Sequence, residues 1–433
     1  MQTTVPDAEQ PGELSDGSDH YETTNEKQGQ ASTTPPPDGG YKAWSQSLLM
    51  HIVFFNTWGV ANGYGVFQEY YTAALNQPPS SIAWIGSVQV FLLFGIGMVS
   101  GRLTDAGYFR PIFTTGVVLQ VFGIFMTSLC TEYWQIFLAQ AVCLGIGNGL
   151  TFCPALAVLA QYFKKNRAFA VGLAAAGAAV GGLVYPVLIN RLIFHQNVTF
   201  GWTLRAMGLI MLITYIPCVI WFQPRLPPTR LTAWTDTSAF TDAPFMFFSL
   251  SMFLNFWGLY FAFFFLGTFA RDKIGVSEPM NLVMVLNGVG ILGRVLPTII
   301  ADRWTGMLNL VIPISVICSV VVFCWIAVVS ATGLYVFAVV YGLLAASLQA
   351  LLPAVATTMT PDPSKTGTRV GMILGFVSLA NLTGPAICGA IIERGNGSYV
   401  GAQIFAGAVI LLGAAMALAA RIAKGGMELR TKI

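Results

Sequence analysis

The sequence predicts an all-α polytopic membrane protein with twelve transmembrane helices in two pseudo-symmetric halves of six. Three observations predict this fold class: the composition, a succession of long apolar segments, and an internal repeat. Of the 433 residues, 55% are hydrophobic and only 9% are charged, and the mean hydropathy is +0.67. Soluble domains carry about 25% charged residues, so a long chain with so few charges indicates repeated membrane crossings.

Residues 1–40 are the exception to this composition. They contain eight acidic residues, one lysine and no apolar run. Because such a segment cannot bury enough apolar surface to fold, we expect a disordered acidic tail on the cytosolic side. The segment also lacks the basic start and apolar stretch of a signal peptide, so we expect the first span to direct insertion.

Twelve segments of the remaining chain are long and apolar enough to span a bilayer, which takes about 20 residues. Six fall in an N-terminal half, residues 41–222, and six in a C-terminal half, residues 244–425. We expect a cytosolic linker at 223–243 and a short cytosolic tail at 426–433. The predicted spans are 44–67, 82–101, 111–130, 134–157, 168–190, 203–222, 244–269, 280–301, 308–330, 333–355, 369–392 and 401–421.

An internal repeat relates the two halves. Asp105 after the second span and Asp302 after the eighth lie 197 residues apart. Two similar six-helix halves are the usual architecture of secondary transporters, in which one half moves against the other around a site near the bilayer midplane. Four further pairs lie 199 residues apart: Pro154 and Pro353, Val171 and Val370, Gly172 and Gly371, and Pro186 and Pro385.

The distribution of positive charge predicts the orientation. If both termini are cytosolic, sixteen of the 22 lysines and arginines lie inside, five lie outside, and Arg294 lies within the membrane. We therefore predict a multi-pass plasma-membrane protein, with the vacuolar membrane as the alternative location. The sequons at Asn197 and Asn396 fall on predicted outer loops, and we expect them to be glycosylated.

Several function classes find no support in the sequence. The chain has no phosphate-binding loop of an ATPase and no basic stripe for nucleic acid. Its three histidines are dispersed and its seven cysteines share no metal-ligand spacing, so we expect no enzyme activity, no metal and no cofactor. The expected partners are the lipid bilayer and a small-molecule cargo, and we expect the protein to act as a monomer.

Three motifs carry a resemblance to known families. The loop "GRLTDAGYFR" (101–110) resembles the signature loop of the major facilitator superfamily. The segments "PDGGYKAW" (37–44) and "YFKKNRAFAVGLAAAGAAVGG" (162–182) resemble motifs of its monocarboxylate porter family, with Asn166 replacing one arginine. The resemblance covers about residues 36–425, is similar to the fungal branch, and implies the major facilitator fold.

The two loops related by the repeat are candidates for a gate. They contain Gly101, Arg102 and Asp105 in the first half, and Asp302 and Arg303 in the second. The resemblance implies that Asp105 pairs with a nearby base to latch the cytosolic side, and a partly exposed ion pair of about 1 kcal/mol suits a gate. The alternative role for these residues is loop order and orientation by charge.

Arg294 is the leading candidate for substrate binding. It lies eight residues from Asp302, roughly 12 Å along a helix, whereas the midplane of the apolar core is at about 15 Å. An arginine at that depth needs a wet cavity or a partner, and its planar fork fits a carboxylate. The alternative is a structural or gating role.

The resemblance supports this role and also reveals a departure from the family. Monocarboxylate porters carry an arginine at this place, thought to bind the carboxylate of the substrate. The proton-coupled members also have an aspartate four residues earlier, where this chain has Gly290, and a lysine in the first span, where it has Ala61 or Asn62. We therefore expect binding of an anion without the usual machinery for proton coupling.

Other polar residues within spans are further candidates for the substrate cavity. Each has an alternative role in a hydrogen bond between helices. The aromatic run at 245–265 in the seventh span is expected to face mostly lipid. These substrate-binding candidates are Asn62, Tyr64, Asn148, Tyr260 and Gln349.

The leading functional hypothesis is a secondary active or facilitated transporter of a small, monocarboxylate-like organic anion, which works by alternating access and binds the anionic group through Arg294. One alternative is an efflux transporter for a larger fungal secondary metabolite. An alternative of another class is a nutrient sensor that uses the same scaffold without transport, which would be expected to carry a long cytosolic domain.

Overall fold

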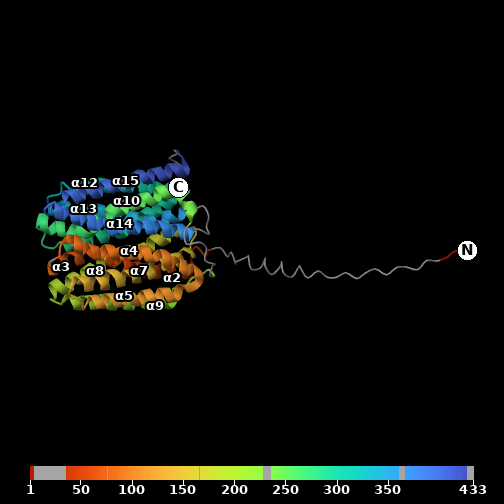
Figure 1. Ribbon diagram of the computed structural model, residues 1–433, viewed down its shortest axis with the longest axis horizontal. Coiled ribbons are helices and arrows are strands. Elements are labelled where there is room, and N and C mark those ends of the chain that lie inside the picture. Colours follow the sequence, from red (N-terminus) through yellow and green to blue (C-terminus); the bar gives the residue numbers. More distant parts are fainter. Residues whose placement is uncertain (4–35, 76, 165, 228–235, 360–365, 427–433) are drawn as a thin grey trace. The chain divides into compact units, whose positions relative to one another are not determined.

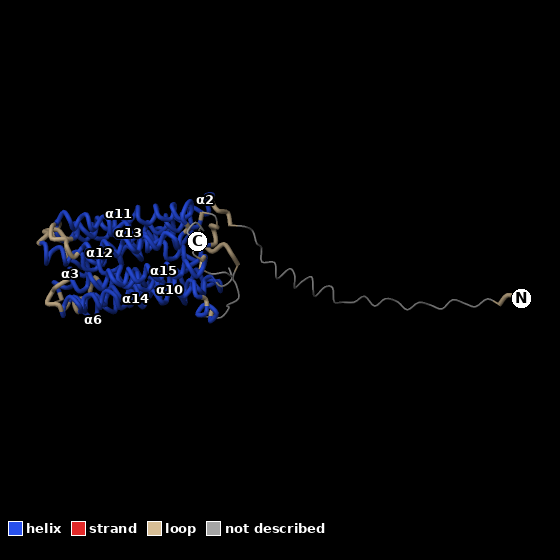
Figure 2. The backbone as a smooth tube through the Cα atoms, turned by 90° about the horizontal axis from the view of Figure 1, so that it is seen from above, coloured by secondary structure: helices blue, strands red, loops and turns tan. Residues whose placement is uncertain are grey.

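The computed structural model describes residues 1–3, 36–75, 77–164, 166–227, 236–359 and 366–426. The chain divides into two compact units, Met1–Pro36 and Pro37–Ile433. In the first unit the described residues, 1–3 and 36, have no regular structure. In the second, all regular structure of the described residues is helical (Figure 2).

The helices of the second unit follow one another in two sets. The first set is α2 (Gly40–Asn62), α3 (Tyr64–Ala74), α4 (Pro79–Leu103), α5 (Phe109–Thr127), α6 (Tyr133–Ile136), α7 (Gly145–Ala160), α8 (Arg167–Asn190) and α9 (Phe200–Trp221). The second set is α10 (Ala243–Phe269), α11 (Met280–Ile300), α12 (Met307–Trp325), α13 (Ala331–Thr358), α14 (Thr366–Arg394) and α15 (Val400–Gly425). Short π-helical turns extend several of them: η1 (Thr104–Tyr108), η2 (Phe137–Leu144), η3 (Arg191–His195), η5 (Ala270–Ile274) and η6 (Ala301–Thr305), and η4 (Thr237–Thr241) is a 3-10 helix.

Each of the twelve predicted spans coincides with a helix of this series. Ten helical runs among the described residues are long and apolar enough to cross a membrane, and one of them, Pro79–Thr127, contains both α4 and α5. The first predicted span is not among the ten. It was expected to be continuous over 44–67, but the structure interrupts it at Gly63, where α2 ends and α3 begins.

The predicted repeat is visible in the backbone. The turns η1 and η6 follow α4 and α11, and both begin 197 residues apart in the chain. Each turn is associated with a glycine in a positive-φ conformation, Gly107 at 94° and Gly306 at 80°. A side chain would strain the backbone there, so both halves use glycine to reverse the chain. Pro154 in α7 and Pro353 in α13 also occupy corresponding helices.

The two halves lie side by side, with helices α2–α9 in one layer and α10–α15 in the other (Figure 1). Across the junction, α4 packs against α14 and α8 packs against α11. The bundle begins with α2 and finishes with α15 at the same end, which we call the terminal end, and α3 lies at the opposite, distal end (Figures 1 and 2).

Two of the family-like motifs contact each other at the terminal end. The backbone N–H of Lys164 donates to the carboxylate of Asp38, and the Asn166 side chain donates to the Asp38 carbonyl. Trp44 packs edge-on against Phe163, with ring centroids 5.1 Å apart. The "PDGGYKAW" segment therefore fixes the start of α2 to the connection between α7 and α8.

The expectation that the aromatic run of the seventh span faces lipid is wrong. Helix α10 packs against α15, α14 and α3, and 83% of its most apolar window is buried within the protein. Residues such as Phe256, Phe261 and Phe264 are each 1% exposed. The run is apolar all round because the helix is enclosed by protein, a pattern that periodicity alone does not distinguish from lipid exposure.

Candidate functional site

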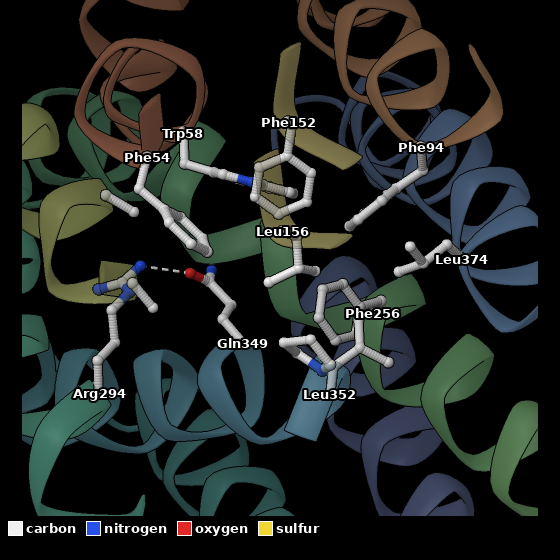
Figure 3. Close-up of a pocket in the computed structure, with 13 residues that line it drawn as sticks. Phe54, Trp58, Phe94, Phe152, Leu156, Phe256, Arg294, Gln349, Leu352 and Leu374 are labelled. Atoms are coloured by element: carbon white, nitrogen blue, oxygen red, sulfur yellow. Dashed lines mark hydrogen bonds between the residues drawn. The ribbon is translucent and has the colours of Figure 1, made fainter. Parts of the chain in front are cut away.

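A cavity lies between the two halves, and Figure 3 shows the side chains that line it. Its volume is about 30 Å³, room for only a few water molecules. Apolar and aromatic groups form nearly all of its wall. The lining residues are Phe54, Trp58, Phe94, Phe152, Leu156, Ala175 and Ala178 from the first half, and Phe256, Arg294, Gln349, Leu352, Pro353 and Leu374 from the second.

Arg294 provides the only charged group of this lining. The α11 helix holds it at the junction with α13, and the side chain is 1% exposed. One guanidinium nitrogen donates to the Gly290 carbonyl at 3.3 Å, and another donates to the side-chain oxygen of Gln349 (Figure 3). Within the described part of the chain no carboxylate pairs with this guanidinium. The cavity therefore presents a cation whose charge is not neutralised.

Gly290 makes room for the guanidinium. A Cβ atom at this position would lie 2.9 Å from the Arg294 Nη1 atom and 3.3 Å from the Ala346 Cβ atom. The absence of a side chain therefore lets Arg294 fold back against its own helix. The departure from the family pattern thus has a direct steric role beside the cation.

Aromatic rings from the first half line the same cavity as the arginine. We call Trp58, Phe94 and Phe152 the ring tier. The Trp58 ring lies 5.1 Å from Phe94 and 5.7 Å from Phe152, measured between centroids. Trp58 also stacks on Tyr260 of α10 across the junction, at 6.4 Å and 21°. Sequence reasoning did not single out these rings, although Trp58 lies one helical turn before the candidate Asn62.

The structure brings together some of the predicted substrate-binding residues and separates others. Arg294 and Gln349 meet in the cavity, and Tyr260 reaches its edge through Trp58. Asn62 and Asn148 are buried but are not part of the lining.

Tyr64 does not fit the prediction that it lines the cavity. Its hydroxyl donates to the Ile82 carbonyl at 2.7 Å, and its ring packs on Phe264 at 4.7 Å. These contacts fix Tyr64 between α4 and α10 on the distal side. It therefore contributes to the closed junction there and not to the cavity wall.

The halves are tied together at the distal end. Glu69 of α3 and Arg271 of η5 form an ion pair at 3.3 Å, and the Ser80 hydroxyl donates to Glu393 at 2.8 Å. Burial raises the pKa of the Glu69 carboxyl, which lies beyond the predicted end of the first span, and Arg271 partly opposes this rise. Close backbone packing reinforces the closure, since a Cβ on Gly65 would lie 2.6 Å from a carbonyl oxygen of α10.

The predicted latch at the terminal end has a different arrangement in the structure. Asp105 is exposed and forms no ion pair within the described residues, so the predicted pairing with a nearby base is not seen there. Arg102 instead reaches across the junction and donates to the Thr368 hydroxyl of α14. Gly101 lies in the last turn of α4, Arg303 is exposed in η6, and the side chain of Asp302 lies outside the described part.

Both predicted glycosylation sites are exposed turns at the distal end. Asn197 and Asn396 adopt positive φ angles of 54° and 51°, a conformation that asparagine tolerates in tight turns. Their exposure leaves the side-chain amides accessible. Glycosylation itself stays a prediction.

Comparisons with known proteins agree with this architecture. The family model described as Major Facilitator Superfamily matches residues 49–332. An MFS-type transporter of Gibberella zeae is 41% identical over 390 residues, 89% of this chain and 87% of the relative.

Two further relatives are named for the compounds they export. The aspyridones efflux protein apdF of Emericella nidulans is 35% identical over 376 residues, 86% of this chain and 76% of the relative. The agnestins efflux protein of Paecilomyces divaricatus is 34% identical over 387 residues, 87% of each chain. These relatives are transporters and not enzymes.

Proposed function

Because the chain belongs to the major facilitator superfamily, it is a multi-pass membrane transporter, and we propose that it exports an apolar secondary metabolite with an acidic group. The observation that carries the proposal is Arg294, a buried cation that pairs with no carboxylate of the described residues and lies in the wall of a largely apolar cavity. An anionic ligand supplies the partner that the described residues do not, through two charge-assisted hydrogen bonds.

The closed cavity argues for alternating access as the mechanism. A volume of about 30 Å³ is too small for a metabolite, so binding requires the halves to move apart. The ties at the distal end and the contact between Arg102 and Thr368 then break and re-form in turn. These are polar contacts between side chains at the junction, so their rupture is compatible with repeated cycles.

Two observations favour a larger metabolite over a short monocarboxylate. Relatives that cover most of this chain are named as efflux proteins for aspyridones and agnestins. The ring tier also offers apolar surface that a short carboxylate would leave uncovered, whereas a flat, conjugated molecule would bury it. The narrower expectation of monocarboxylate transport therefore has less support.

The orientation belongs to the same proposal. With both termini in the cytosol, the terminal end takes up cargo and the distal end releases it outside the plasma membrane. Arg294 binds the acidic group and Gln349 orients the guanidinium, while the Trp58 and Tyr260 rings separate the cavity from the distal side.

Deletion of the gene in the organism that carries it tests the export function. We expect at least one acidic, ultraviolet-absorbing compound to fall in the medium and rise in the cells, as measured by untargeted mass spectrometry. Reintroduction of the wild-type gene restores the pattern, whereas an Arg294→Ala gene with normal membrane expression does not. Unchanged distribution of every acidic compound would contradict the proposal.

A further inference from the structure

Three buried amide side chains lie just beyond the ring tier. Asn62 follows Trp58 by four residues on α2, and Asn148 precedes Phe152 by four residues on α7. Residues four apart share a helix face, and the two helices run in opposite directions. Both amides therefore lie one turn closer to the distal end than the rings that face the cavity.

Gln89 of α4 lies beside the same place. A Cβ atom on Gly145 would be 3.1 Å from the Gln89 Cα atom, so α4 and α7 nearly touch within a turn of Asn148. We call Asn62, Gln89 and Asn148 the amide tier. Their side chains are 0%, 1% and 1% exposed.

No side-chain nitrogen or oxygen of the amide tier has a hydrogen-bond partner among the described residues. The side-chain nitrogen and oxygen of all three residues are buried and unpartnered within the described part of the chain. Asn56, which is equally buried on the same helix, differs in this respect. It donates to Thr214 at 3.0 Å and accepts from Tyr185 at 2.6 Å.

Unpartnered buried amides are rare because each loses its hydrogen bonds to water without replacement. Three such residues on neighbouring helices oppose the stability of the ligand-free protein, and the described residues offer their side chains no partner. The Trp58 and Tyr260 rings lie at the edge of this region, and the Trp58 Nε1–H and the Tyr260 hydroxyl are also unpartnered. The amide side chains, the Trp58 Nε1–H and the Tyr260 hydroxyl are thus available to a molecule that moves past the stacked Trp58 and Tyr260 rings.

We propose that the amide tier is a second binding subsite, which receives neutral hydroxyl or carbonyl groups of the cargo. This inference rests on the proposed function and defines its substrate class. The cargo is a conjugated molecule with an acidic group at the Arg294 end and hydrogen-bonding groups at the other. Asparagine and glutamine suit this task because each offers both donors and an acceptor without a net charge.

Two probe acids that differ in one hydroxyl group test the subsite. Binding of 2-naphthoate and 6-hydroxy-2-naphthoate to the full chain in lipid nanodiscs is measured by isothermal titration calorimetry. The wild type is expected to bind the hydroxylated acid about tenfold more tightly, as one additional hydrogen bond in a buried site predicts. Asn62→Leu and Asn148→Leu are expected to abolish this preference, so that each variant binds the two acids with equal Kd.

Asn56→Leu is the matched control, since it removes an amide of equal burial that has partners. It is expected to keep the tenfold preference and to lower Tm, whereas Asn62→Leu and Asn148→Leu are expected to raise the Tm of the ligand-free protein.

The outcomes separate the subsite from the proposed function. Equal binding of the two acids by the wild type overturns the subsite alone. If Asn62→Leu, Asn148→Leu and Gln89→Leu all still bind the hydroxylated acid more tightly, the subsite proposal is also overturned. The amide side chains would then bind ordered water and not the cargo. Failure of both acids to bind the wild type contradicts the anion-binding function together with the subsite.

Discussion

The two halves of the protein share one fold but give the cavity unlike walls. The wall from the first half consists of aromatic and aliphatic groups, whereas the second half contributes Arg294 and Gln349. Helices α4 and α11 are equivalent in the repeat, so the counterpart of Arg294 lies 197 or 199 residues earlier, at Gly97 or Gly95.

The packing differs between these two counterparts. A Cβ atom on Gly97 would lie 2.3 Å from the Cys153 sulfur of α7, so a side chain there would have to displace that sulfur, whereas a Cβ atom on Gly95 would meet nothing within 4 Å. In α11 the glycine lies one turn away, at Gly290, and the space it leaves is occupied by the guanidinium. Of the two equivalent helices, α4 thus packs closely against α7, whereas α11 holds a cation.

Removal of the cation should have the largest effect on ligand binding, because it removes the charge that distinguishes the wall of the second half from that of the first. Arg294→Ala leaves two apolar walls, and we expect the Kd of 2-naphthoate to rise at least about 100-fold, because a buried charge-assisted contact is lost. Arg294→Lys keeps the charge without the planar fork, so its Kd for 2-naphthoate should lie between the values for the wild type and for Arg294→Ala. Calorimetry in nanodiscs measures both, with Arg205→Ala at the distal end as the control. If Arg294→Ala binds 2-naphthoate as tightly as the wild type, the arginine does not bind the carboxylate, and the two walls do not differ in function.

An acid at position 290 should have the next largest effect. Gly290→Asp places a carboxylate against the Arg294 guanidinium, whose Nη1 atom is 2.9 Å from the Cβ position. The internal pair then competes with the ligand, and we expect the Kd of 2-naphthoate to rise about 30-fold. Gly290→Ala is the matched control. It adds only a methyl group, which displaces the end of the flexible Arg294 side chain and presses lightly on the Ala346 Cβ atom, and its effect should stay within about threefold. Similar losses in both variants would indicate a steric effect and not a neutralised cation.

Much of the fold was predictable from the sequence because it depends on length, hydropathy and repeat. The twelve apolar segments, the two halves and the paired turns after α4 and α11 all follow from those patterns. The break at Gly63 was not predictable, since an isolated glycine is also common within continuous membrane helices.

The site was predictable only where a residue is costly in a membrane. Arg294 was identified because a buried charge demands an explanation, and Gln349 because it is polar within a span. Trp58 and Phe152 could not be distinguished from ordinary lipid-facing or core rings, because their role depends on which helices meet. The hydrogen bond from Arg102 to Thr368 joins the two halves, and no local motif in the sequence encodes such a contact.

Removal of a ring should weaken the apolar wall by a smaller factor. Trp58→Ala eliminates the contacts with Phe94, Phe152 and Tyr260, and we expect the Kd of 2-naphthoate to rise about tenfold. Acetate has no ring, so its Kd should be the same for Trp58→Ala as for the wild type. Trp58→Phe retains an aromatic surface and should recover most of the affinity. Equal losses for both ligands would mean that Trp58 supports the arginine and not the ring of the cargo.

The smallest predicted effect concerns how the unlike halves are held together at the distal end. Glu69→Gln removes the ion pair with Arg271, whose side chains are 16% and 40% exposed, so the pair stabilises the closed junction by well under 1 kcal/mol. Hydrogen exchange of the α3 amides should therefore accelerate about threefold. Arg271→Gln should act alike, and the double variant should be no faster than either single change, because both remove the same contact. Asp272→Asn, which affects only a local and more exposed pair, should leave α3 unchanged. Additive acceleration in the double variant would show that the two side chains act separately and not as an ion pair.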